Sequence, residues 1–268
     1  MMDTATAAQV MHGRPVGGSV PFLRVTTDSR DLRAGDLFVA LRGERFDGHD
    51  FVQKALAEGA AAALVAADRA VALTGTLIAV DDPLVALGRL AAHWRARFDL
   101  PLAVVVGSNG KTTVKEMTAA ILREAFGADD VLATRGNLNN AIGLPLTLLR
   151  LTPAHRAAVI ELGMNHRGET RELVAIARPT IVVANNAQRE HQEFMTSVAE
   201  VAAEHADAIA GLAEGGTAVI NADDAHADVW RDAAARAGAR VTTFALTAPA
   251  DVAASVRMDA AGSMLALN

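Results

Sequence analysis

The alternation of apolar and polar positions predicts a small α/β region in the first part of the chain. Short apolar runs at 36–41, 60–65 and 76–80 have the length and composition of buried strands. Apolar residues recur with helical spacing over 51–59 and again over 83–98. Strands separated by helices are typical of a layered α/β domain. We therefore expect residues 1–98 to form one domain.

A second domain is expected over residues 99–268, after the punctuation Asp99-Leu100-Pro101. Apolar strand candidates and helical segments alternate along this part of the chain. The strands are expected at 104–106, 131–134, 157–162, 180–185, 217–221 and 240–244. This alternation predicts a mostly parallel sheet with helices on both faces. Ligands of such sheets gather at the carboxyl ends of the strands, so polar residues there are the candidates for chemistry.

A glycine-containing loop follows the apolar run 104–106 and leads directly into a helical segment. Its residues are Gly107, Ser108, Asn109, Gly110, Lys111, Thr112 and Thr113. Glycines let backbone N–H groups approach phosphate oxygens, and the start of a helix directs its positive dipole end at an anion. The lysine can then reach the β and γ phosphates, and the first threonine can hold magnesium. The loop predicts a triphosphate site.

The spacing of this loop is shorter than the usual phosphate-binding pattern, which would place glycine where the chain has Val105. A chance glycine turn is therefore the alternative. The surrounding pattern favours a nucleotide site, because a strand precedes the loop and a helix is predicted over 111–126. Its apolar face is expected at Met117, Ile121, Leu122 and Phe126.

Three further polar features follow predicted strands. Glu161 ends a buried strand and is a candidate magnesium ligand, with a solvated or capping carboxylate as the alternative. His191 lies in a polar loop after another strand, where a lone histidine is more often on the surface than a ligand. Asn137, Asn139 and Asn140 can donate to an anionic substrate, although asparagine clusters usually build turns.

Composition narrows the classes of protein that remain. The chain has 268 residues, of which 51% are hydrophobic, which is enough for a sizeable core. A net charge of −6 argues against general nucleic-acid binding, and no apolar run approaches the roughly 18 residues of a membrane span. The absence of cysteine excludes disulfides and thiolate metal sites. We expect a cytoplasmic protein that neither binds nucleic acid nor inserts into a membrane.

Several motifs, taken in order over about residues 20 to 250, resemble the ATP-dependent Mur ligases. The phosphate loop has the short spacing of that family. The N-terminal motifs are similar to the uridine-nucleotide domain of two of its members, and the central motifs to the member that adds D-alanyl-D-alanine. These motifs are Thr27-Asp28-Ser29-Arg30, Gly35 to Leu41, Asp47-Gly48-His49, Asn137 to Leu149 and Glu161 to Glu169.

The resemblance implies a cytoplasmic peptidoglycan-precursor ligase that uses ATP and Mg²⁺. ATP would phosphorylate the terminal carboxylate of UDP-N-acetylmuramoyl-tripeptide, and the amine of D-alanyl-D-alanine would displace the phosphate. Lys111, Glu161 and His191 would be catalytic, with Thr112, Glu161 and His191 as metal ligands. The implied substrate contacts are Ser29, Arg30, Asp47, Gly48, His49, Asn137, Asn139 and Asn140.

Two departures from the family pattern affect these expectations. Many Mur ligases hold a second magnesium through a carbamylated lysine, but no lysine follows Lys115, so Glu204 or Asp207 is the candidate substitute. Family members also continue into a C-terminal Rossmann-like domain. We therefore expect a truncated chain that is a monomer and is weak or inactive alone.

Three alternatives remain to be distinguished at this point. The third-residue ligase of the same pathway shares the N-terminal motifs, and a non-catalytic nucleotide-binding module would share the phosphate loop. A signalling GTPase is disfavoured, because its Asn/Thr-Lys-x-Asp signature needs a lysine after Lys115 and none occurs.

Overall fold

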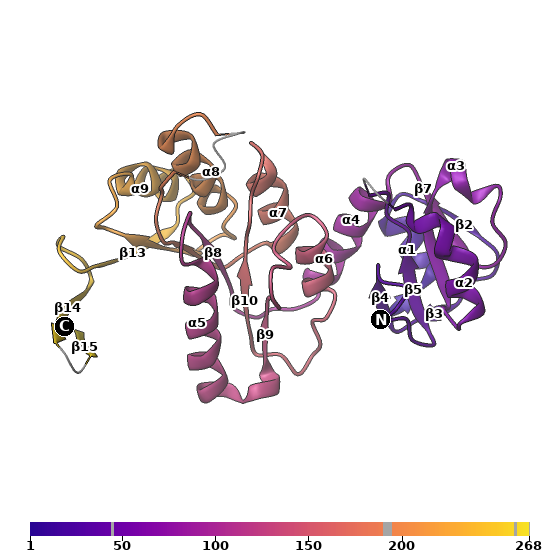
Figure 1. Cartoon of the computed structure of the whole chain (residues 1–268), viewed down its shortest axis with the longest axis horizontal. Helices are drawn as coiled ribbons and strands as arrows, with labels where there is room; N and C mark the ends of the chain where they lie inside the picture. The colour runs from indigo at the N-terminus through magenta and orange to yellow at the C-terminus, as the bar shows by residue number, and fades with distance from the viewer. Residues whose placement is uncertain (44–45, 190–194, 260–261, 268) are drawn as a thin grey trace. The chain divides into compact units, whose positions relative to one another are not determined.

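The computed structural model describes residues 1–43, 46–189, 195–259 and 262–267. The described chain divides into two compact units (Figure 1). The first contains Met1–Phe98 together with Ala141–Leu151, and the second contains Asp99–Asn140 together with Thr152–Asn268. The segment Ala141–Leu151 therefore clusters with the first unit, which a single division at residue 98 does not capture.

The first unit is built on a five-stranded sheet of order β2-β7-β6-β5-β4, parallel except for β2. Its central strands are buried and, apart from Asp36 at the start of β5, apolar, as expected for a sheet covered on both faces. The strands are β2 (Arg14–Val16), β4 (Arg24–Thr26), β5 (Asp36–Val39), β6 (Ala62–Ala66) and β7 (Leu77–Val80). A separate antiparallel pair joins β1 (Met2–Asp3) to β3 (Pro21–Phe22).

Six helical segments accompany this sheet in the described part of the first unit. The longest, α4, begins where the Asp82 carboxylate accepts hydrogen bonds from the N–H groups of Leu84 and Val85, with Pro83 in the first turn. It buries Leu87, and α6 packs against it. The segments are α1 (Thr4–Val10), η1 (Gly48–Phe51), α2 (Val52–Ala57), α3 (Ala67–Ala70), α4 (Pro83–Arg95) and α6 (Gly143–Leu148).

The second unit is built on an eight-stranded sheet of order β15-β14-β13-β12-β11-β8-β10-β9. All neighbouring pairs are parallel except β14 and β15, which form an antiparallel hairpin. The strands are β8 (Leu102–Val106), β9 (Val131–Ala133), β10 (Ala157–Glu161), β11 (Ile181–Ala184), β12 (Thr217–Asn221), β13 (Arg240–Ala245), β14 (Val252–Asp259) and β15 (Gly262–Leu267).

Helices of the second unit pack along this sheet (Figure 1). α5 contacts β8, β9 and β10, α8 contacts β8 and β11, and α9 contacts β12 and β13. A core cluster under α5 joins Val105, Ala119, Ala133 and Val159. The helical segments are α5 (Lys111–Phe126), η2 (Ala128–Asp130), α7 (Glu169–Ala177), α8 (Val198–Ala210) and α9 (Ala227–Arg236).

The predicted α/β class with mostly parallel sheets is confirmed, and α5 has the predicted bounds. The predicted apolar face of α5 is wrong at Met117 and Ile121, which are 62% and 67% exposed, whereas Leu122 packs against the core cluster under the helix and Phe126 is half-buried. The fully buried residues of the helix are Lys115 and Ala119, on the side that faces the sheet. Lysine is a polar residue, so a pattern of apolar positions does not indicate that Lys115 faces the sheet.

Candidate functional site

The loop between β8 and α5 has the backbone of an anion site. Gly107 and Gly110 adopt φ values of 147° and 74°, in the region that favours glycine. A Cβ at Gly107 would lie 2.9 Å from the Asn185 Cβ, so no larger residue fits there without movement. α5 begins at Lys111, and Gly110 has no side chain to cap it. The first-turn N–H groups are therefore suited to bind phosphate oxygens.

Lys111 lies across the same loop. Its Nζ donates to the carbonyl oxygens of Gly107 at 2.5 Å and Ser108 at 3.2 Å. These contacts keep the ammonium over the loop rather than extended along the helix. A lysine in this place supplies a point charge to a bound phosphate.

Glu161 is the buried acid of this site. It ends β10, next to β8 in the sheet, and is only 3% exposed. Its Oε2 accepts from the Thr112 hydroxyl at 2.8 Å, and its Oε1 accepts from the Asn139 amide at 2.7 Å. The structure therefore brings together three residues that the sequence suggested from three separate segments.

Neutral groups hold Glu161 in place. The backbone N–H of Glu161 donates to the Thr134 hydroxyl at 3.0 Å. Asn139 is itself held, because its carbonyl accepts from the Gly163 N–H at 2.9 Å and a Cβ at Gly163 would lie 2.8 Å from the Asn139 side chain. The charge of Glu161 thus faces hydroxyl and amide donors, which suits a site that receives a cation.

The loop after β11 braces the phosphate loop, a role that sequence reasoning missed. The Asn186 side chain accepts from the Asn109 N–H at 2.9 Å, and the Asn185 amide donates to the Asn109 carbonyl at 2.7 Å. Ser108 Oγ donates to the Gln188 carbonyl at 3.1 Å. Two polar residues directly after a strand were the available signal, but their partners depend on β11 lying beside β8.

Asp224 holds the residues that directly follow the Asn185-Asn186 pair. Its carboxylate accepts from the Ala187 N–H at 2.8 Å and from the His226 N–H at 2.8 Å. Asn221 adds a bond from its amide to the Asn185 carbonyl at 2.8 Å. His191 itself lies outside the described residues, so its assignment as a metal ligand stays a prediction.

The remaining asparagines of the cluster are placed differently from Asn139. Asn137 is exposed, and its backbone carbonyl accepts from the Asn139 N–H at 2.8 Å in a tight turn. Asn140 is also exposed. Asn139 is therefore the member of the cluster that the structure brings to Glu161.

The two candidate substitutes for a carbamylated lysine have different surroundings on α8. The Asp207 carboxylate pairs with Arg171 at 3.1 Å. Glu204 is 7% exposed, and its Oε1 accepts from the Gly168 N–H at 2.7 Å at the start of α7. Its Oε2 has no hydrogen-bond partner within the described part of the chain. Of the two, Glu204 retains an oxygen that can bind another group.

In the first unit, the Asp47-Gly48-His49 turn is held by internal contacts. The Asp47 carboxylate accepts from the His49 N–H at 3.0 Å and from Arg69 at 2.5 Å. The buried His49 ring accepts from the Ala66 N–H through Nε2 and therefore donates to Asp47 through Nδ1. A Cβ at Gly48 would lie 2.8 Å from the Leu41 backbone. The turn is a rigid element at the carboxyl ends of β5 and β6.

A cavity of about 260 Å³ opens at the same edge of the first sheet. Arg42 lines it and donates to Asp68 at 2.6 Å, while Asp82 belongs to the cap of α4. Ligands of open α/β sheets bind at this edge. The lining residues are Leu41, Arg42, Ala66, Asp81, Asp82, Pro83, Leu84 and Ile142.

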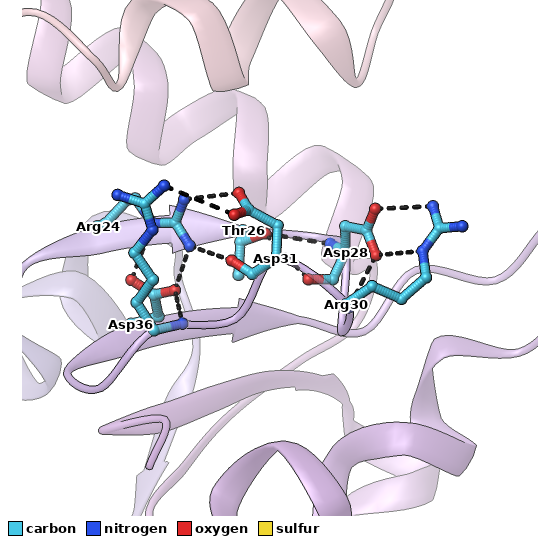
Figure 2. A network of polar contacts seen from close by, with 7 residues as sticks. Arg24, Thr26, Asp28, Arg30, Asp31 and Asp36 are labelled. Atoms are coloured by element: carbon cyan, nitrogen blue, oxygen red, sulfur yellow. Dashed lines mark hydrogen bonds and ion pairs between the residues drawn. The ribbon is translucent and has the colours of Figure 1, made fainter. Parts of the chain in front are cut away.

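Arg30, a predicted substrate contact, lies on the turn after β4 with Ser29. Figure 2 shows its guanidinium paired with the Asp28 carboxylate, at one end of a polar network whose other end joins Arg24 to Asp36. The hydrogen bonds from the Arg30 side chain and N–H lower the pKa of Asp28 to about 2. Because the Arg30 side chain is 88% exposed, it can exchange this partner for a ligand anion.

Replacing Asp47 with asparagine is expected to destabilise the first unit by about 2 kcal/mol at pH 7, the range for hydrogen bonds to a charged group. Burial raises the pKa of this carboxyl, but the bonds from His49 and Arg69 outweigh it and hold the pKa well below its usual range. A depressed folded-state pKa stabilises above the unfolded value, near 4, and this contribution disappears as pH falls through the folded value.

Urea unfolding followed by circular dichroism from pH 7 to pH 2 tests this expectation. The urea concentration at the wild-type midpoint should decrease once the pH is lowered below about 4. For Asp47→Asn, the midpoint at pH 7 should be lower than that of wild type, and it should change less as the pH is lowered. Asp50→Asn, an exposed change in the same turn, is the control. Equal midpoints for Asp47→Asn and Asp50→Asn at pH 7 would contradict the assignment.

The described acidic and histidine side chains do not form a complete metal site. Among the described residues, no group of three or more histidine, cysteine, aspartate or glutamate side chains could hold a metal by itself. A magnesium ion in this site would therefore need oxygens from a bound phosphate as well as those of Thr112 and Glu161, which is how magnesium usually binds together with nucleotides.

Among the residues that the structure describes, no helix has the length and apolar character to span a membrane.

Comparison with known proteins supports the reading of both units. Residues 105–268 match the Mur ligase middle domain, and residues 22–95 match the Mur ligase family catalytic domain. The UDP-N-acetylmuramoyl-tripeptide–D-alanyl-D-alanine ligase of Escherichia coli K12 is 46% identical over 215 residues, which cover 80% of this chain and 46% of that protein. The chain spans about half the length of the curated relatives it matches.

Solved structures give the same result. MurF from Acinetobacter baumannii superposes with a TM-score of 0.87 at 30% identity, covering 99% of this chain and 60% of that one. MurF ligase from Thermotoga maritima, solved in complex with ADP, gives a TM-score of 0.76 at 27% identity, covering 91% and 55%. The matched domains account for both units of the structure, and the chain therefore belongs to the Mur ligase family.

Proposed function

We propose that this chain provides the precursor-binding and ATP-binding parts of a ligase that joins D-alanyl-D-alanine to UDP-N-acetylmuramoyl-tripeptide. The observation that carries the proposal is the meeting of Lys111, Thr112 and Glu161 around a glycine loop. The names of the relatives support the choice of substrates. Residues 1–98 would bind the uridine nucleotide, and residues 99–268 would bind ATP.

The proposed reaction forms an acyl phosphate and then an amide. A carboxylate oxygen of the tripeptide attacks the γ-phosphorus of ATP, and the bond to the bridging oxygen breaks to release ADP. The amine of D-alanyl-D-alanine then attacks the activated carbonyl, loses a proton, and expels phosphate as the C–N bond forms. Phosphoryl transfer of this kind depends on positioning and charge stabilisation more than on covalent help from the protein.

Each residue of the site has a role in this scheme. Lys111 and the first-turn N–H groups of α5 would bind the β and γ phosphates and stabilise the charge that develops on them. Thr112 and Glu161 would hold Mg²⁺, which neutralises phosphate charge and aligns the transferring group. The brace from Asn185 and Asn186 keeps the loop rigid, so little reorganisation is needed on binding.

The first unit would hold the uridine-linked substrate. Its cavity lies beside the Asp47-Gly48-His49 turn, and Ser29 and Arg30 lie on a neighbouring turn after β4. Arg30 would release Asp28 to pair with a diphosphate oxygen, since it is exposed and its present ion pair is solvent-screened. The acceptor peptide would lie near Asn137, Asn139 and Asn140. His191 would bind a second metal ion. We also propose that the protein is cytoplasmic, because the uridine-linked precursor is a cytoplasmic substrate in this family. We propose in addition that it is a monomer.

Measuring phosphate release with matched substrate pairs tests the proposal. Release is expected with ATP, Mg²⁺, UDP-N-acetylmuramoyl-tripeptide and D-alanyl-D-alanine, and mass spectrometry should detect the amide product. Greater release with the shorter UDP-linked dipeptide and a diamino acid would favour the third-residue ligase. Nucleotide binding without any release would favour a non-catalytic module.

A further inference from the structure

Lys115 is a buried cation that the proposed reaction does not use. Its side chain is 0% exposed, although lysine is almost never fully buried in proteins unless it is paired. It lies one turn after Lys111 on α5, on the face that packs against the sheet. Burial of an ammonium is costly unless its donors are satisfied, so its contacts identify what it does.

Two acceptors receive the Lys115 ammonium. Its Nζ donates to the Thr134 carbonyl oxygen at 2.9 Å and also forms a close ion pair with the Glu116 carboxylate. Glu116 is 54% exposed in its side chain and faces water, so it balances the charge at the edge of the protein. Thr134, in contrast, is 1% exposed and lies directly after β9.

Thr134 connects this lysine to the acid of the phosphate site. Its hydroxyl accepts the backbone N–H of Glu161 at 3.0 Å, and its own N–H donates to the Val159 carbonyl at 3.1 Å. Glu161 then accepts from Thr112, which is on the first turn of α5. The four residues therefore close a ring that starts on α5, passes through the ends of β9 and β10, and returns to α5.

We propose that Lys115 is a positioning residue that sets the distance between Thr112 and Glu161. The inference rests on the proposed function, in which these two residues hold Mg²⁺ with ATP. The ammonium ties α5 to the end of β9, and Thr134 transmits that position to Glu161. Because Glu116 balances its charge and Glu161 contacts only neutral donors among the described residues, Lys115 leaves the Glu161 charge for the metal.

The test measures how ATP binding depends on Mg²⁺ in the chain of 268 residues, by calorimetry at a series of Mg²⁺ concentrations. Lys115→Met keeps the length of the side chain and removes its donors. We expect the Mg²⁺ concentration at half-maximal enhancement of ATP binding to rise about tenfold or more, the usual cost of losing a group that orients a metal ligand. ATP binding without Mg²⁺ should change less than about twofold, because the phosphate loop itself is intact.

Two further variants separate position from charge and from folding. Thr134→Val removes the hydroxyl that accepts from Glu161 but keeps the carbonyl that accepts from Lys115, and it should shift the Mg²⁺ midpoint in the same direction. Glu116→Gln removes the counter-charge and keeps the ring, so its midpoint should stay near wild type. Thr134→Val decides the question if Lys115→Met does not fold, and thermal melting identifies that case.

The outcomes distinguish this inference from the proposed function. Wild-type Mg²⁺ midpoints in folded Lys115→Met, or in Thr134→Val, would overturn the positioning role alone. A shift in Glu116→Gln as large as that in Lys115→Met would also overturn it, because charge balance would then be the cause. If wild-type protein showed no Mg²⁺-dependent ATP binding, the proposed function itself would fail.

Discussion

The Lys111→Ala variant is expected to bind Mg²⁺–ATP about 10 to 100 times more weakly than the wild-type chain, because hydrogen bonds to charged groups contribute about 1.5 to 3 kcal/mol. The Lys111 ammonium lies over the loop through the carbonyls of Gly107 and Ser108. From there it can reach phosphate oxygens without moving the backbone. Calorimetric titration with ATP at saturating Mg²⁺ measures the effect.

Lys54→Ala is the matched control for this experiment, because it removes the same charge from an exposed lysine of the first unit. The Lys54 side chain is 64% exposed and pairs with Glu58 at 3.7 Å. Its dissociation constant for ATP should agree with wild type within about twofold, since exposed charges are screened. If Lys111→Ala also bound ATP like wild type, the loop would not be the triphosphate site.

Trp230→Ala is expected to lower the free energy of unfolding of the second unit by about 3 to 5 kcal/mol, the range for large buried aromatic residues. Trp230 is 0% exposed on α9 and is among the largest fully buried side chains. Its indole N–H donates to the Ala202 carbonyl on α8 at 3.0 Å, and its ring lies 6.2 Å from that of His205. The residue therefore joins α9 to α8.

Urea unfolding measured by far-UV circular dichroism tests this effect without relying on tryptophan fluorescence. Trp230→Phe is the matched variant, because it keeps most of the apolar volume and loses the indole N–H. It should destabilise clearly less than Trp230→Ala. A midpoint for Trp230→Ala close to that of wild type would mean that the contact between α8 and α9 contributes little to the second unit.

Much of the fold was predictable because its central strands are apolar runs bounded by turns. β12 and α5 have their predicted bounds, and β8, β10 and β11 lie within a few residues of the predicted strands. The short strands β1 to β4 were not predicted. Their partners supply the burial and hydrogen bonds that make them strands, and two or three residues carry too little pattern to indicate this.

The site was predictable to the extent that its residues follow strands. Glu161 and Asn139 were candidates because one ends an apolar run and the other follows one, and in the structure the Asn139 amide donates to the Glu161 carboxylate. Asn186 and Asp224 were missed, because their hydrogen bonds to Asn109 and Ala187 span 77 and 37 positions along the chain. Such pairs depend on the order of strands in the sheet, which a single sequence does not specify.

The sequence by itself determined the local chemistry of this protein: a strand, a glycine loop and a helix in an order that suits a phosphate, with family motifs on either side. Only the tertiary structure decided which groups complete the site. The parallel sheet places β8 between β10 and β11, so Glu161 comes to Thr112 and the Asn185-Asn186 pair comes to the loop. It also buries Lys115, because the Thr134 carbonyl directly after β9 and the Glu116 carboxylate both receive its ammonium and so offset the cost of burying the charge.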